Sequence, residues 1–148
     1  TDAVFVTLHV SSTGIPGTAR VYFCSTLPAP PQPQPVAGQA PPPRRPTGLL
    51  EWDRAQEPYL ALSQRLAELV QIQLAQHFQG SPEAPSSAPL RQLRTVTAPA
   101  IAIEVSNVAL DAAKLSQMGQ PLGDALARAV SAFQQALAED AAEPAPTR

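Results

Sequence analysis

The chain has 148 residues, the size of one ordinary domain. Hydrophobic residues make up 44% of it, enough for a core, while charged residues reach only 15% and the formal net charge is −2. This balance provides no basic surface for nucleic acid, and no apolar run approaches the roughly 20 residues of a membrane span. A single cysteine excludes an internal disulfide framework and a cysteine zinc cluster. Proline is the unusual component, since 9 of its 18 residues fall between positions 28 and 46.

Two segments near the N-terminus have the composition of β-strands. Residues 3–10 (AVFVTLHV) and 18–24 (TARVYFC) are rich in β-branched and aromatic side chains, and a turn-forming stretch with three Gly or Pro residues separates them. Apolar side chains occur on both faces of each segment, which favours a sheet covered on both sides. Because the first residues already form a strand, we expect the sequence to be the later part of a longer chain.

A proline-rich insertion at about 27–47 follows the second strand. Proline lacks an amide donor and fixes φ, so this stretch is expected to be an extended spacer at the surface. Its run PPPRRP places basic residues beside PxxP-like spacing, which also suits a docking segment for a protein partner with a proline-recognising module. The sequence leaves both interpretations open.

A long amphipathic helix and a buried strand follow the insertion. After Pro58, apolar residues recur at spacings of three and four until Gly80, which is typical of a helix with one buried face. Residues 80–89 (GSPEAPSSAP) are expected to form a loop. The AIAIEV core of the segment 97–107 is apolar on both faces, as in the central strand of a covered sheet.

A second helical region begins near Asp111. Gly119 and Pro121 are expected to interrupt it, before a final helix that ends near Asp140. The tail at about 141–148 is expected to be frayed.

The order strand, strand, helix, strand, helix predicts an α/β fold. We expect one domain over residues 1–148, with a mixed, mostly covered β-sheet flanked by amphipathic helices.

Two polar residues lie within the predicted strands at positions that suit chemistry. His9 is near the end of the first strand, where ligands collect in α/β sheets, although a surface imidazole is the structural alternative. Glu104 lies among apolar neighbours in IAIEV, and a carboxylate is expensive to bury there without a partner or a metal. It is therefore a candidate ligand or general base, with an ion pair to Arg94 or Arg91 as the structural alternative.

The other reactive residues favour structural roles. His77 lies at the end of the long helix, where the helix dipole favours it, and Cys24 in a strand is expected to be a small buried hydrophobe. The patterns HxxxH, HExxH, CxxC and GxSxG and a glycine-rich phosphate loop are all absent. From the residues alone, the chain supports half of a metal or acid–base site.

Two segments together carry a resemblance to a known family. The first, DAVFVTLHVSSTGIPGTARVYF, contains His9, and the second, LRQLRTVTAPAIAIEVSN, has a ten-residue spacing from Arg94 to Glu104. In this order, and with predicted helices between and after them, they resemble the zinc-dependent N-acetylmuramoyl-L-alanine amidases. The resemblance covers most of the chain outside residues 25–50.

The resemblance implies a peptidoglycan hydrolase. Such an enzyme cleaves the amide between the lactyl group of N-acetylmuramic acid and the L-alanine of the stem peptide. In this family zinc is held by two histidines and a glutamate, and a further glutamate acts as general base and acid. His9 matches the second histidine ligand and Glu104 matches the catalytic glutamate. The implied partner is peptidoglycan or a muropeptide, and the implied location is the cell envelope, periplasmic or extracellular.

The sequence also departs from the family. The first histidine and the glutamate ligand lie upstream of the segment around His9, so we expect the remaining zinc ligands outside this chain and little activity from it alone. After Glu104 the family usually has glycine and an aromatic residue, where this chain has Val105 and Ser106. An alternative is therefore a degenerate, non-catalytic amidase-like module for cell-wall or partner binding. Missing strands would also expose a sheet edge through which the chain self-associates.

Overall fold

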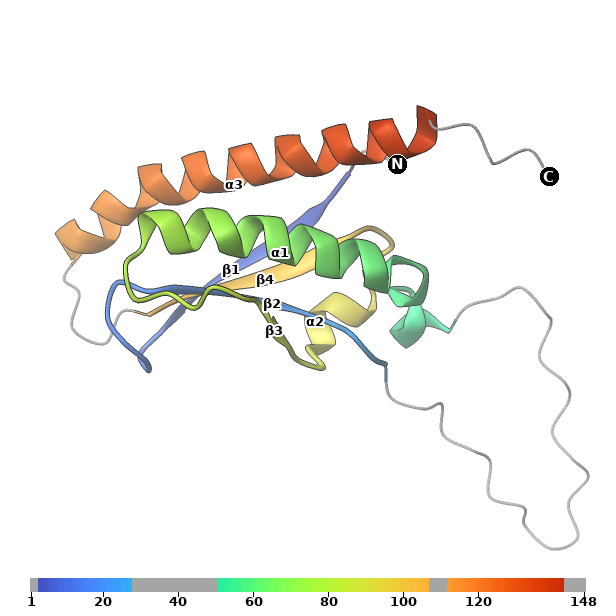
Figure 1. The fold of residues 1–148 in the computed structure, drawn as a ribbon. Coiled ribbons are helices and arrows are strands. Elements are labelled where there is room, and N and C mark those ends of the chain that lie inside the picture. The colour runs from blue at the N-terminus through green and yellow to red at the C-terminus, as the bar shows by residue number, and fades with distance from the viewer. Residues whose placement is uncertain (1–2, 28–50, 107–111, 143–148) are drawn as a thin grey trace, which may run out of the picture.

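The computed structural model describes residues 3–27, 51–106 and 112–142 and confirms the α/β class (Figure 1). Its strands form one four-stranded mixed sheet in the order β1-β4-β2-β3. β1 runs parallel to β4, whereas β2 runs antiparallel to it. The strands are β1 (Phe5–Ser11), β2 (Ala19–Phe23), β3 (Ser86–Ser87) and β4 (Ala100–Ser106), and the helices are α1 (Leu60–His77), α2 (Arg91–Arg94) and α3 (Ala112–Ala142).

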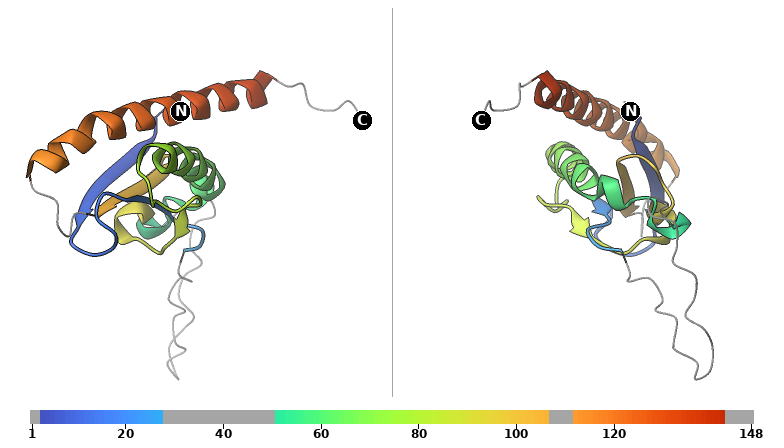
Figure 2. Two further views of the ribbon diagram at one scale, coloured as in Figure 1. Left: turned by 60° about the vertical axis from the view of Figure 1, so that its left-hand side comes forward. Right: turned by 90° about the vertical axis from the view of Figure 1, so that its right-hand side faces the viewer.

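The two faces of the sheet are covered differently. The long helices α1 and α3 lie on one face, and the short α2 lies on the other (Figures 1 and 2). Successive β4 residues alternate between these layers, as the apolar pattern on both faces predicts. Ile101, Ile103 and Val105 pack toward α1 and α3, and Ala100 and Ala102 pack beside Leu93 of α2. Every residue of β4 is buried except Glu104, which is partly exposed.

Helix α1 is tied to the sheet by two buried polar side chains. Two short 3-10 turns, η1 (Trp52–Arg54) and η2 (Glu57–Tyr59), lead into it, with a proline in the first turn of η2. The Ser63 hydroxyl oxygen accepts the Ala100 amide at 2.9 Å. The Gln71 carboxamide oxygen accepts the Val21 amide at 2.7 Å. These bonds fix the position of α1 across β2 and β4.

The predicted interruption at Gly119 and Pro121 is wrong, because α3 runs unbroken with Pro121 inside it. Proline costs a helix interior about 3 kcal/mol, mainly through the lost donor and a clash with the preceding turn. The carbonyl that loses its partner belongs to Gln117, which is exposed, so water can replace the missing donor. Packing beyond the proline offsets the cost, since Ala125, Ala129 and Phe133 are all buried.

Coverage of both faces is confirmed for β4. It is wrong for β2, where only the face with Ala19, Val21 and Phe23 is buried, and for β1. Leu8 and Val10 are 53% and 57% exposed. The cause is that β1 is an edge strand, with β4 on one side only. Val4 and Val6 still pack against the helical core, whereas the second half of the strand extends beyond it.

Two other expectations concern the ends of the described segments. The proline-rich insertion lies outside the described residues from position 28 to its end, as does the tail from position 143. Residues 141 and 142, expected to belong to that tail, are the last of α3. Among the helices of the described residues, none is both long and apolar enough to cross a membrane.

Candidate functional site

The structure brings the two candidate residues together. His9 of β1 and Glu104 of β4 are Cα partners in the parallel ladder, near the carboxyl ends of both strands. Partners in a ladder lie on the same face of the sheet, here the face away from α1 and α3. The ends of parallel strands are where α/β sheets bind ligands, so the location suits a functional site.

Both residues line one open cleft of about 410 Å³. The sheet forms its floor, and the segment around α2 forms one wall. The remaining lining residues are Val10, Ser11, Tyr22, Leu90, Gln92, Ala102 and Ile103. The cleft therefore combines an imidazole, a carboxylate and a phenol with an apolar floor, which is the usual composition of a small-molecule or peptide site.

His9 is exposed and has two side-chain partners. Its Nε2 lies 3.0 Å from Nε2 of Gln92 and 3.2 Å from Oγ1 of Thr7. When the Gln92 amide donates, the imidazole Nε2 is the acceptor and the ring proton sits on Nδ1. A metal at this nitrogen would need the same lone pair, so Gln92 has to turn away before His9 can act as a ligand through Nε2.

Glu104 has no hydrogen bond or ion pair to any described side chain. The structural alternative of an ion pair with Arg91 or Arg94 is absent from the described residues, and Nη2 of Arg94 instead donates to the Pro89 carbonyl at 3.2 Å. The carboxylate is thus left open to the cleft. A free carboxylate at a cleft floor is able to accept or deliver a proton.

The fit to zinc is incomplete within the described residues. A catalytic zinc ion takes about three protein ligands. The described part of the chain contains no group of three or more His, Cys, Asp and Glu side chains that could hold a metal ion. His9 and Glu104 alone do not make such a site.

Cys24 is buried, as predicted. Its thiol donates to the carbonyl of Ala88 at 3.4 Å, and its side chain packs with Leu93 in the small core under α2. Burial raises the pKa of the Cys24 thiol above its ordinary value. A protonated, enclosed thiol is a poor nucleophile, so this residue is structural.

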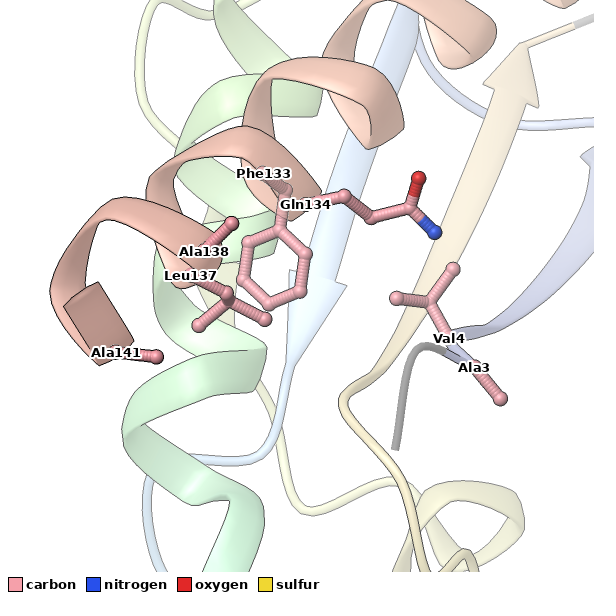
Figure 3. A pocket seen from close by; sticks show the side chains of 7 residues that line it. All are labelled: Ala3, Val4, Phe133, Gln134, Leu137, Ala138 and Ala141. Atoms are coloured by element: carbon pink, nitrogen blue, oxygen red, sulfur yellow. The ribbon is translucent and has the colours of Figure 1, made fainter.

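A second hollow lies between α3 and the start of β1 (Figure 3). It measures about 300 Å³ and is lined by Ala3, Val4, Phe133, Gln134, Leu137, Ala138 and Ala141. None of these side chains is ionisable or nucleophilic. The hollow therefore offers no acid–base or metal chemistry, and the site is placed at the His9–Glu104 cleft.

Two polar residues that line the cleft, Tyr22 and Gln92, and the neighbouring Arg20 escaped the sequence analysis. Tyr22 and Arg20 alternate with the buried Val21, so the period of β2 could have placed both on the face that bears Glu104. Gln92 had no such signal, because its contact with His9 depends on how the segment before β4 folds back over the sheet.

Comparison of the chain with protein-family models, with curated proteins and with solved structures gives no match. The resemblance to the amidases accordingly depends on the two segments quoted for it.

Proposed function

We propose that this chain forms the glutamate-bearing part of an N-acetylmuramoyl-L-alanine amidase site, acting on peptidoglycan or muropeptides in the cell envelope. One observation carries the proposal. His9 and Glu104, each singled out in a different segment of the sequence, are ladder partners on adjacent strands and line the same cleft. A chance likeness in two separate segments gives no reason for His9 and Glu104, which are 95 positions apart in the sequence, to meet.

The chemistry assigned to Glu104 is proton transfer. Its carboxylate takes a proton from water as the water oxygen attacks the carbonyl carbon of the lactyl group. It then delivers this proton to the nitrogen of L-alanine as the C–N bond breaks, leaving a lactyl carboxylic acid and a free amine. General acid–base catalysis of this kind contributes roughly 10²- to 10⁴-fold in rate. Zinc ligands other than His9 come from outside the described residues.

The alternative proposal is a non-catalytic module of the same fold that binds the cell wall or a partner. It is favoured by the hydrogen bond between Gln92 and His9, which engages the nitrogen that a metal would need. Such a module binds muropeptide equally well with and without a chelator. Loss of binding on chelation would contradict it.

The test of the amidase proposal compares Glu104→Gln with a matched control. The control is Glu68→Gln, an exposed residue on α1 and therefore on the opposite side of the sheet. Hydrolysis of a soluble muropeptide by the full-length protein is followed through the new amino group of L-alanine. We expect Glu104→Gln to lower kcat at least about 100-fold, with unchanged circular dichroism, and Glu68→Gln to have no effect. Equal turnover in both variants would refute the assignment.

A further inference from the structure

A smaller hollow of about 300 Å³ adjoins the candidate cleft and shares Tyr22 and Glu104 with it. It extends from Glu104 over β2 toward the turn between β1 and β2. The other lining residues are Thr13, Gly14, Ile15, Thr18, Arg20, Gly80, Pro82 and Ser106. Two of the lining residues are glycines with positive φ, Gly14 and Gly80. Gly14, for example, has φ +92°, and a Cβ there would lie 2.7 Å from the Ser106 hydroxyl.

Among the residues that the structure describes, Arg20 is the one lysine or arginine that lines this hollow or the cleft beside it. It is the Cα partner of Glu104 on β2, just as His9 is its partner on β1. The three residues thus form a row across three adjacent strands on one face, in the order His9, Glu104, Arg20. The row positions an imidazole and a guanidinium on either side of the carboxylate.

Among the described residues, the Arg20 guanidinium has no ion-pair partner. Although its ladder partner is Glu104, no ion pair joins the two, and no other described carboxylate pairs with Arg20. The side chain is exposed and lines the hollow. An arginine is well suited to hold a carboxylate, because its planar fork donates two parallel hydrogen bonds to the two oxygens.

We propose that this hollow is a carboxylate subsite in which Arg20 binds an acidic group of the peptide portion of the substrate. The assignment rests on the proposed function. Neighbouring strands are about 4.8 Å apart, and an extended peptide advances about 3.4 Å per residue. If the amide bond to be cleaved lies over Glu104, a carboxylate bound by Arg20 therefore belongs to a residue about one or two positions further along the peptide. Arg20 selects substrates whose stem peptide is acidic at that distance.

The test measures binding of N-acetylmuramoyl-L-alanyl-D-isoglutamine, which has a free carboxyl group, against the same compound with that group amidated. The full-length protein with Glu104→Gln is used, so that neither compound is consumed. We expect the acid to bind about 2- to 5-fold more tightly than the amide, because Arg20 is exposed and water weakens an exposed ion pair. Arg20→Gln in this background should abolish the preference, and Arg20→Lys should retain part of it.

The control is Arg128→Gln, which removes the same charge from an exposed position on α3, on the opposite side of the sheet. It should leave the preference unchanged. Equal binding of acid and amide before Arg20 is changed would overturn the subsite and leave the amidase proposal intact. Failure of both compounds to bind at millimolar concentration would overturn the two proposals together.

Discussion

Substitution of Gln71 gives a quantitative test of how α1 is held against the sheet that carries the candidate site. This side chain is fully buried on α1. Its oxygen accepts the Val21 amide at 2.7 Å, and its Nε2 donates to the carbonyl of Pro82 at 2.7 Å. β3 pairs only with Tyr22 and Phe23 of β2. The amide of the preceding residue, Val21, therefore has no acceptor on β3 and donates to the Gln71 side chain instead.

Replacing Gln71 with alanine removes these bonds and leaves a small void. A buried amide without an acceptor costs about 1–3 kcal/mol. The void adds roughly 1 kcal/mol or more, and the partly solvated Pro82 carbonyl adds little because water can reach it. We therefore expect the free energy of unfolding to fall by about 2–4 kcal/mol in Gln71→Ala, and by less than about 0.5 kcal/mol in the exposed control Gln76→Ala.

The assay is urea unfolding followed by far-ultraviolet circular dichroism, with the slope of the transition checked for constancy. A second variant, Gln71→Leu, restores the volume without restoring the acceptor. It should remain less stable than the unsubstituted protein, because the Val21 amide is still unpaired. Full stability in Gln71→Leu would refute the hydrogen-bond argument and assign the whole effect to packing.

Three further predictions concern a helix, a turn and a thiol. Pro121→Ala restores an amide donor inside α3 and should raise the free energy of unfolding, by up to about 3 kcal/mol in urea titrations; an unchanged value would mean that the proline is not strained there. Gly14→Ala should destabilise the protein by at least about 1 kcal/mol more than Gly17→Ala. Both glycines have positive φ, but only at Gly14 would a Cβ meet a close neighbour, the Ser106 hydroxyl. Equal thermal midpoints of the two variants would contradict this contact. Because burial raises the pKa of the Cys24 thiol, its reaction with a thiol reagent at pH 8 should be slow in the native protein and fast in denaturant; rapid native labelling would show that the thiol is accessible. The raised pKa also makes stability depend on pH. Because the folded protein favours the protonated Cys24 thiol, the free energy of unfolding should fall as the pH rises through the native pKa of this thiol.

The elements with a strong pattern were predictable from the sequence, and those governed by packing were not. The apolar residues on both faces of AIAIEV correctly indicated a central strand, and the spacing of three and four residues correctly indicated α1. The continuity of α3 through Pro121 was not predictable, because it depends on the buried contacts that follow the proline. The exposure of Leu8 and Val10 depends on strand order, which composition does not encode.

The candidate site shows the same division. His9 and Glu104 could each be selected locally, as a strand-end imidazole and as a carboxylate among apolar neighbours. Their meeting depends on the parallel pairing of β1 with β4, a long-range contact between strands separated by most of the chain. Gln92 reaches His9 only through the fold of the α2 segment, so no local pattern identified it.

The most direct test of the account is the zinc content of the purified full-length protein, determined by metal analysis. If His9 belongs to a zinc amidase site completed by ligands outside the described residues, the protein should hold close to one zinc ion per chain. His9→Ala should then lose most of that zinc, and His77→Ala, which removes an exposed histidine at the end of α1, should retain it. Zinc that is absent throughout, or equally retained in His9→Ala, would contradict the account and favour the non-catalytic module.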